Sequence, residues 1–256
     1  MTVDGHTEET ILGSYLRSVK ALVSREVAAD DHMFPASGEM SAYLNVGQAA
    51  LQAVTLAQMS VGQSQPQRIM DFGCGAGRVT RWFRAAYPAA HLTASELRQE
   101  SLDFVCSEFD ATPHVSSQNL RDLTLPGAYD LIWVGSVITH LSESDSRFLL
   151  DRLFGALEPG GVMVFTTHGR KMLQNQILGR HEYITPNRFI RLIAQATVCG
   201  YGHAPHVDGG YSGISVTTMS WIAQWCGSSP ERRLVGLTEM GWCDHQDVVA
   251  VTKSTF

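Results

Sequence analysis

The stretch that decides the fold is Arg68-Ile69-Met70-Asp71-Phe72-Gly73-Cys74-Gly75-Ala76-Gly77-Arg78. It begins as a short apolar strand, residues 68–72, which runs into three alternating glycines and then into a helical pattern at 79–86. Glycines let the backbone pass close to a ligand, because no Cβ stands in the way. The N-terminus of the helix behind them favours anionic or strongly dipolar groups. This glycine turn is therefore the predicted ligand site.

Strand and helix patterns alternate beyond this turn. Strands are predicted at 91–95, 129–134 and 162–167, and helices at 98–109, 142–157 and 185–200. Strands separated by helices indicate a parallel, doubly wound sheet. Two closing strands, 234–239 and 247–252, have only a short glycine-containing connection and are predicted to be antiparallel to each other.

The N-terminal segment has a different pattern. Residues 6–29 place Ile11, Leu12, Tyr15, Val19, Leu22 and Val23 on one face of an amphipathic helix. A second helix is predicted at 42–59, and residues 61–67 form a polar linker. We therefore predict a helical cap or lid over residues 1–66 and a main domain over residues 67–256.

Composition excludes several classes of protein. The 256 residues contain 19 Lys+Arg and 25 Asp+Glu, a net charge of -6 that argues against a nucleic-acid partner. The five cysteines form no CxxC pair, so neither a metal site nor a disulfide framework is expected. No apolar run approaches the ~18 residues of a membrane helix, and the N-terminus has no apolar leader. We expect a cytoplasmic protein with reduced thiols and no membrane partner.

The glycine spacing distinguishes between two kinds of cofactor. A dinucleotide fingerprint, G-x-G-x-x-G, would need a glycine where Arg78 stands. Strand-Asp-x-Gly-x-Gly-x-Gly instead resembles motif I of the class I S-adenosylmethionine (SAM) dependent methyltransferases. Residues 129–136 resemble the fourth strand of that family, and residues 157–161 resemble the turn before its fifth. The resemblance implies an α/β, Rossmann-like, seven-stranded sheet, mostly parallel, with an antiparallel last strand.

The resemblance also implies which residues bind SAM. Asp71 would hold the amino group of the cofactor or orient the turn, Glu96 would bind the ribose, and Leu97 would pack on the adenine. The family usually has an aspartate at the adenine edge; this sequence has none at an obvious place, and Asn119 is expected there. The remaining residues expected at the cofactor are Gly73, Cys74, Gly75 and Gly77 in the turn, Gly135 after the fourth strand, and Tyr43 folding over from the cap.

A base is useful if the methyl acceptor is a hydroxyl or an amine. Histidine has the most suitable ordinary pKa, and the candidate catalytic residues are His168, His140 and His245, each following or preceding a strand. Each could equally be a loop or capping histidine. Arg170 could hold an anionic acceptor group or be solvated, and Tyr211 lies in a glycine-rich loop that could act as a lid. Trp221 and Trp225 share a helix face that belongs either to the core or to a substrate platform.

The predicted function is SAM-dependent transfer of a methyl group to an oxygen or nitrogen of a small molecule or peptide. One alternative is an NAD(P)-dependent oxidoreductase, which also uses a carboxylate such as Glu96 for a ribose. A second is an inactive SAM-binding partner subunit. The amphipathic first helix fits a homodimer interface as well as a cap.

Overall fold

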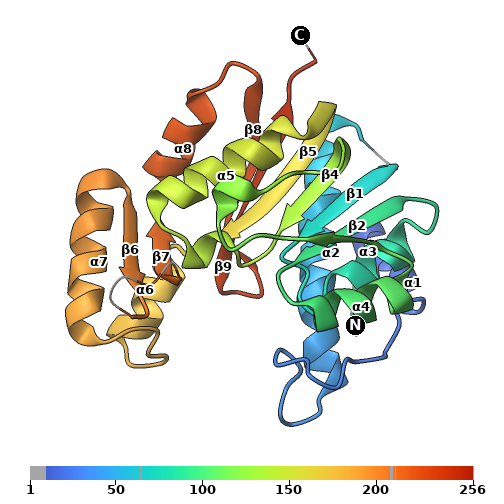
Figure 1. Cartoon of the computed structure of the whole chain (residues 1–256), viewed down its shortest axis with the longest axis horizontal. Helices are drawn as coiled ribbons and strands as arrows, with labels where there is room; N and C mark the ends of the chain where they lie inside the picture. The colour runs from blue at the N-terminus through green and yellow to red at the C-terminus, as the bar shows by residue number, and fades with distance from the viewer. Residues whose placement is uncertain (1–9, 64, 208–209, 211, 256) are drawn as a thin grey trace, which may run out of the picture.

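The computed structural model describes residues 10–63, 65–207, 210 and 212–255. Helices and strands alternate over most of this length (Figure 1). The elements, in chain order, are α1 Ile11–Lys20, α2 Met40–Val61, β1 Arg68–Phe72, α3 Thr80–Ala86, β2 His91–Glu96, α4 Gln99–Phe109, β3 Thr112–Val115, η1 Leu120–Asp122, β4 Tyr129–Val134, η2 Ile138–His140, α5 Glu143–Gly155, β5 Leu157–Thr167, α6 Arg170–Ile177, α7 Pro186–Cys199, β6 Tyr201–Pro205, β7 Gly213–Thr217, α8 Met219–Gly227, β8 Arg232–Trp242 and β9 Gln246–Lys253.

One seven-stranded sheet forms the centre, in the order β3-β2-β1-β4-β5-β9-β8. The first five of these strands are parallel to one another, and β9 is antiparallel to both of its neighbours. The predicted fold class is thereby confirmed. Register aligns Phe72 of β1 with Ser95 of β2 and Val134 of β4, so the segments after these strands meet at one edge.

The strands are buried on both faces, as their continuous apolar runs predict. Ile69, Leu131 and Val164 belong to the core under α1 to α4. Met70 and Ile132, one residue along each strand, belong to the core under α5 and α8, because successive side chains point to opposite faces. Each such burial contributes about 1.5–3 kcal/mol, so the two cores hold the carboxyl ends of the strands in fixed positions.

The second N-terminal helix packs directly on the sheet. Leu51 and Val54 of α2 are fully buried in the same core as Trp133 of β4 and Trp242 of β8. Trp242 Nε1 also donates a hydrogen bond of 2.9 Å to the carbonyl oxygen of Val46. The division into a cap and a main domain at residue 66 stays a prediction, but α2 shares its core with the sheet.

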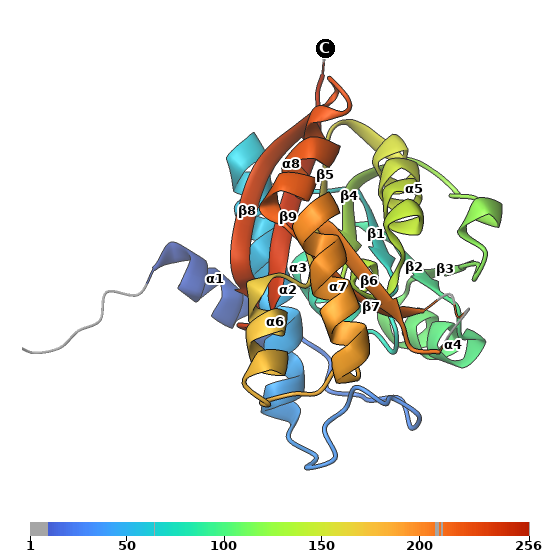
Figure 2. The same ribbon diagram turned by 90° about the vertical axis from the view of Figure 1, so that its left-hand side faces the viewer.

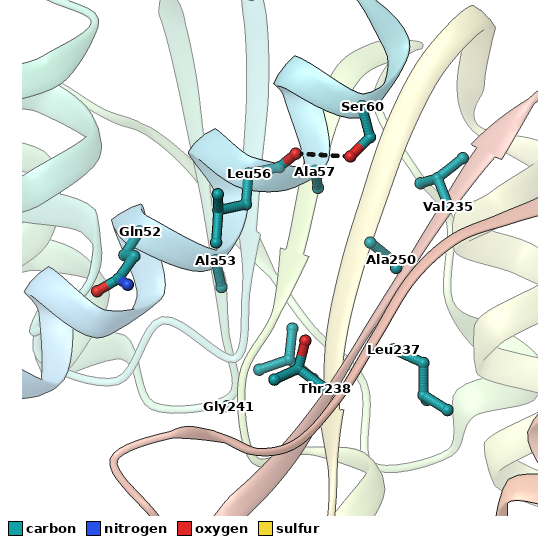
Figure 3. A pocket seen from close by; sticks show the side chains of 12 residues that line it. Gln52, Ala53, Leu56, Ala57, Ser60, Val235, Leu237, Thr238, Gly241 and Ala250 are labelled. Carbon is teal, nitrogen blue, oxygen red and sulfur yellow. Dashed lines mark hydrogen bonds between the residues drawn. The ribbon is translucent and has the colours of Figure 1, made fainter. Parts of the chain in front are cut away.

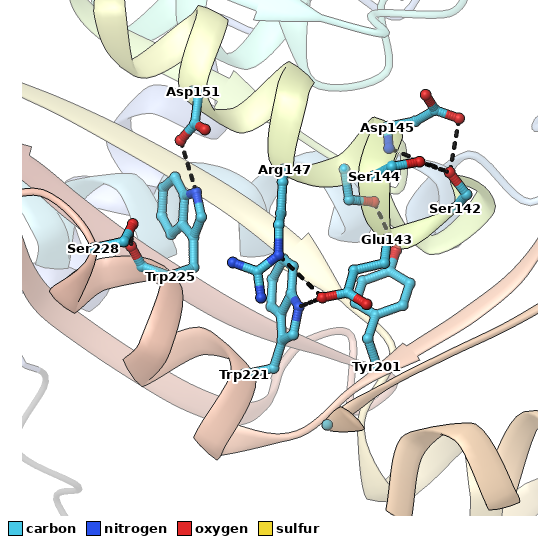
Figure 4. A network of polar contacts seen from close by, with 12 residues as sticks. Ser142, Glu143, Ser144, Asp145, Arg147, Asp151, Tyr201, Trp221, Trp225 and Ser228 are labelled. Atoms are coloured by element: carbon cyan, nitrogen blue, oxygen red, sulfur yellow. Dashed lines mark hydrogen bonds and ion pairs between the residues drawn. The ribbon is translucent and has the colours of Figure 1, made fainter. Parts of the chain in front are cut away.

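Helices α5 and α8 are joined by hydrogen bonds from two tryptophans (Figure 4). Trp221 Nε1 donates to Glu143 Oε1 at 2.8 Å, and Trp225 Nε1 donates to Asp151 Oδ1 at 2.9 Å. Both indole rings are almost completely buried. The pair therefore belongs to the core and does not form a substrate platform. The predicted N-cap of α5 is also present, since Ser142 Oγ accepts from the Asp145 amide.

Sequence patterns did not predict the small lobe between β5 and α8. It consists of α6, α7 and the antiparallel pair β6–β7, with its own core of Met172, Phe189 and Leu192 among others (Figures 1 and 2). The α7 helix begins after Thr185 at Pro186, as predicted. Strands β6 and β7 were not predicted, because β6 contains Gly202 and Pro205, residue types that are disfavoured in strands.

The connection between β8 and β9 is shorter than the predicted glycine-containing loop. Both Cys243 and Asp244 have positive φ values, of 56° and 52°, and the His245 amide donates to the Trp242 carbonyl oxygen. These features indicate a turn of the type I′ class with Cys243 and Asp244 as its central residues, inside a three-residue connection between Trp242 and Gln246. The tight turn places Trp242 and His245 beside the ends of β4 and β5.

Candidate functional site

The glycine turn links β1 to α3 and is fixed by its backbone. Gly73, Gly75 and Gly77 have φ values of 76°, 54° and 79°, in the region that favours glycine. A Cβ on Gly77 would lie 2.3 Å from Phe109, whereas a Cβ on Gly75 would meet nothing within 4 Å. Gly77 is thus needed for packing, and Gly75 faces open space that a ligand can approach.

Asp71, at the end of β1, is almost completely buried under this turn. Its carboxylate accepts a hydrogen bond of 2.6 Å from Thr80 Oγ1. Burial, together with the charge of Glu96, raises the pKa of Asp71 to about 7, although the hydrogen bond from Thr80 acts in the opposite direction. A positively charged ligand group beside this buried carboxyl would favour its ionised form, so Asp71 is suited to bind a cation.

Glu96, at the end of β2, reaches back to the glycine turn. Its Oε2 accepts from the Gly75 amide at 3.0 Å, and its Oε1 accepts from the Leu97 amide at 2.7 Å. The neighbouring Leu97 side chain is exposed. The carboxylate for which the resemblance implies ribose binding therefore lies against Gly75, and the exposed leucine expected at the adenine follows it in the chain.

Five of the predicted residues meet at one cavity of ≈ 90 Å³. Its walls are Asp31, Met33, Asp71, Gly73, Cys74, Gly75, Ala76, Arg78, Val79, Trp133, Gly135, Ser136 and Trp242. Asp31, Arg78, Ser136 and Trp242 were not predicted at this site. Arg78 could have been found, because it directly follows the last glycine. The others reach the cavity through tertiary folding.

Arg78 is the cation of this cavity. Among the described residues its guanidinium has no hydrogen-bond or ion-pair partner, although burial lowers its pKa. Asp31, from the segment before α2, lies on the same cavity. The walls thus carry both signs of charge, which suits a ligand that has an ammonium and a carboxylate.

Tyr43 does not line this cavity; it supports a residue that does. Its hydroxyl donates to Asp31 Oδ2 at 2.5 Å, and Arg81 lies over its ring. The buried Arg81 side chain in turn donates to the carbonyl oxygens of Gly77, Ser24 and Glu26. This arginine therefore fastens the N-terminal segment to the glycine turn.

Asn119 lies apart from the glycine-turn cavity. Its Oδ1 accepts from the Arg121 amide at the start of η1, and its Nδ2 donates to Asp122. It lines a separate cavity of ≈ 330 Å³ with Leu141 and Asp145. The predicted role of Asn119 at the adenine edge stays a prediction.

A larger cavity of ≈ 440 Å³ lies between α2 and the β8–β9 pair (Figure 3). Apolar side chains such as Leu56, Val235 and Leu237 form most of its wall. None of the predicted site residues lines it. Charged groups are also absent from its described lining, so it lacks partners for a zwitterionic ligand.

Two of the candidate histidines hold the lobe against the sheet. His168, which follows β5, donates from Nδ1 to the carbonyl oxygen of Ser215 at 3.1 Å, and His140 donates likewise to Gly213 at 2.9 Å. Both acceptors lie on β7. Burial lowers the pKa of each ring, in His168 to about 3, so both are neutral at pH 7.

His245 is more accessible than the other two. Its ring stacks on Tyr183 with a centroid distance of 5.8 Å and lies 5.4 Å from the ring of His168. Burial lowers its pKa, and the nearby charges of His181 and Lys171 act in the same direction. Tyr183 was not predicted at the site, because only the fold of the lobe brings it there.

Two further expectations concern Arg170 and Tyr211. Arg170 forms an ion pair with Glu239 and is exposed. Tyr211 lies outside the described residues. Within the described part of the chain there is no cluster of potential metal ligands and no helix long and apolar enough to cross a membrane.

Comparison with known proteins gives matches of one kind. Residues 69–161 match the methyltransferase domain family. A malonyl-[acyl-carrier protein] O-methyltransferase of Pseudescherichia vulneris is 29% identical over 126 residues, which is 49% of this chain and 48% of that protein. The match thus spans about half the length of this relative.

Two solved structures share the fold. A SAM-dependent methyltransferase from Clostridium acetobutylicum superimposes with a TM-score of 0.57 at 13% identity, covering 83% of this chain and 92% of the other. The plantazolicin methyltransferase BpumL, solved with S-adenosylhomocysteine, gives 0.55 at 13% identity and covers 94% and 100%. These findings agree with the predicted fold class, the predicted cofactor and the resemblance to class I SAM-dependent methyltransferases: residues 69–161 match a methyltransferase domain, and the chain has the fold of SAM-dependent methyltransferases.

Proposed function

We propose that the protein transfers the methyl group of SAM to an oxygen, or a nitrogen, of a small molecule or peptide. The observation that carries this proposal is the glycine-turn cavity, where Asp71, Arg78 and the open face of Gly75 come together. Its opposite charges match the ammonium and carboxylate of the methionine part of SAM. The site therefore fits SAM, the cofactor of the methyltransferases that the chain resembles.

Each polar group of SAM has a partner in this proposal. Arg78 binds the methionine carboxylate, because its guanidinium has no other partner among the described residues. Asp71 and the carbonyl oxygen of Gly135 receive the ammonium group. Glu96 accepts from the ribose hydroxyls, and Leu97 packs on the adenine. Met33 and Trp242 exclude water from the same cavity.

When bound, SAM supplies a methyl group that its sulfonium activates. The protein must then hold the acceptor in line with the methyl carbon and the sulfur. His245 is the best placed of the three histidines to take a proton from a hydroxyl acceptor, because its ring is the least buried of the three. His168, with a pKa of about 3, is a weak base and serves instead to hold β7.

The two alternatives differ in what they bind. An oxidoreductase would bind NADH, and Arg78 in place of the third fingerprint glycine argues against it. An inactive partner subunit would bind SAM without transferring its methyl group. A binding titration distinguishes the proposed methyltransferase from an oxidoreductase. A methyl-transfer assay distinguishes it from an inactive partner subunit.

Isothermal titration of SAM, S-adenosylhomocysteine and NADH tests the cofactor site. We expect the first two to bind the wild type and Gly75→Val to bind neither, because the branched side chain would fill the open face of the turn. Gly179→Val is the matched control: Gly179 also has a positive φ and open space around it, but it follows α6. Loss of binding in both variants, or binding of NADH alone, would contradict the proposal.

A further inference from the structure

A closed hydrogen-bond network of Ser136, Thr166 and Gln246, called the circuit below, joins the ends of β4, β5 and β9 beside the glycine-turn cavity. The Ser136 amide donates to Thr166 Oγ1 at 2.8 Å, and Thr166 Oγ1 donates to Gln246 Oε1 at 2.6 Å. Gln246 Nε2 then donates to Ser136 Oγ at 2.9 Å. Residues of β5 and β9 thus fix Ser136: Thr166 accepts from its backbone amide, and Gln246 donates to its side-chain oxygen.

The circuit leaves one proton without a strong partner. Thr166 gives its hydroxyl proton to Gln246, and the amide of Gln246 gives its proton to Ser136. The remaining neighbour, Thr139, donates its own proton to the Ser136 carbonyl oxygen at 2.8 Å and lies 3.4 Å from Ser136 Oγ. The proton of the Ser136 hydroxyl is therefore available to a ligand.

The backbone at Ser136 is held in an unusual conformation. Its φ is 60°, a region that non-glycine residues enter at a cost in energy. The bonds to Thr166, Gln246 and Thr139 hold it there. Such strain is tolerated where the surroundings define the geometry, and it is common at functional sites. Ser136 lines the glycine-turn cavity together with Trp133 and Trp242.

The surroundings favour an acceptor that needs no base. No histidine is among the described residues that line the glycine-turn cavity, and the rings of His140 and His168 bind carbonyl oxygens of β7. Burial also lowers the pKa of these two rings and of His245, so each holds a proton less well than a free histidine. A carboxylate is already ionised at neutral pH and needs no proton removed. It also accepts hydrogen bonds without donating any, which matches a donor hydroxyl.

We propose that Ser136 donates a hydrogen bond to a carboxylate of the methyl acceptor, so that the product is a methyl ester. A lone pair of one carboxylate oxygen forms the new bond to the methyl carbon. The S–CH3 bond breaks, its electron pair stays on sulfur, and no proton is released. Ser136 holds the acceptor by hydrogen bonding, while Gln246 and Thr166 are positioning residues. This inference rests on the proposed methyl-transfer activity.

A labelling experiment tests the class of acceptor. The full chain is incubated with SAM carrying a tritiated methyl group and with matched carboxylic acids, alcohols and amines, or with a bacterial metabolite extract. Alkali releases volatile methanol from methyl esters but not from methyl ethers or methylamines. Base-labile label supports the inference. Base-stable label overturns the carboxylate while preserving methyl transfer, and absence of any label overturns the proposed function itself.

Variants of the circuit test the role of Ser136. With the labelled acceptor, Ser136→Ala should lower kcat/KM by about 10- to 100-fold, since one hydrogen bond to a charged group is lost. Ser136→Gly, which relieves the backbone strain, should show the same loss. Gln246→Glu should also lower it, because a carboxylate would accept the Ser136 proton and remove it from the ligand.

Binding of S-adenosylhomocysteine tells whether Ser136 serves the carboxylate of the acceptor or that of the cofactor. The methionine part of SAM also has a carboxylate, so Ser136 could serve the cofactor instead. We expect Ser136→Ala to lose more in kcat/KM for the acceptor than in affinity for S-adenosylhomocysteine, whereas Ser107→Ala, a control at an exposed serine of α4, should change neither. A weakened cofactor affinity with unchanged acceptor kinetics would overturn the inference.

Discussion

Replacing Asp71 by asparagine should stabilise the ligand-free protein at alkaline pH and weaken its binding of SAM. Asparagine keeps an oxygen that can accept the hydrogen bond from Thr80. It removes the charge that the wild type must bury once Asp71 ionises. The same charge is what the SAM ammonium requires, so stability and binding change in opposite directions.

The magnitude follows from the pKa of the buried carboxyl. Asp71 has a pKa of about 7 against an ordinary value of 3.8, a difference of about 3 units, or about 4 kcal/mol at ~1.4 kcal/mol per unit. Because the folded-state pKa is raised, the stability linked to this group is fully present below about pH 4 and is lost as pH rises through about 7. The variant should therefore exceed the wild type by up to about 4 kcal/mol at about pH 8 and equal it at about pH 4.

Urea unfolding of both proteins across this pH range measures the difference. Asp110→Asn is the control, because Asp110 is an exposed residue at the end of α4 whose left-handed φ also suits asparagine. Its stability should follow the wild type at every pH. A constant difference between Asp71→Asn and the wild type, or a difference that grows as pH falls, would refute this reasoning.

Three further substitutions test the supports of the site and the core. Tyr43→Phe removes the hydrogen bond to Asp31; calorimetric titration should find weaker SAM binding, and denaturant unfolding a loss of about 1 kcal/mol, whereas unchanged affinity would contradict the support role. Trp225→Ala should lower the free energy of unfolding by about 3–5 kcal/mol without changing SAM affinity in the folded protein, and a loss under about 1 kcal/mol would show that the ring is not core. Ser142→Ala should cost about 1 kcal/mol in denaturant unfolding, because the N-cap of α5 is lost; a stability equal to that of the wild type would mean that the cap contributes nothing.

The sequence was most informative where one residue type has one local consequence. The glycine turn after Asp71, the cap at Ser142 and the Thr185-Pro186 helix start all follow from short-range backbone chemistry. Together with strand spacing, they predicted the order of the elements. The same reasoning placed Glu96 at the end of β2.

Features formed by contacts between distant segments were not predictable in this way. Tyr43, expected at the cofactor, does not line the glycine-turn cavity; the loop before α2 brings Asp31 to that cavity, and the Tyr43 hydroxyl donates a hydrogen bond to it. Ser136 and Trp242 meet at the cavity only because β4 and β8 belong to the same sheet. Strands β6 and β7 depend on pairing with each other and on hydrogen bonds from two histidines.

A crystal structure with S-adenosylhomocysteine tests the central claim most directly. We predict that its carboxylate contacts Arg78, its ribose contacts Glu96, and its sulfur lies beside Gly135 and Ser136 at the glycine-turn cavity. Binding of the nucleoside in the apolar cavity between α2 and β8, or a ligand that leaves Arg78 and Glu96 without contacts, would contradict the account.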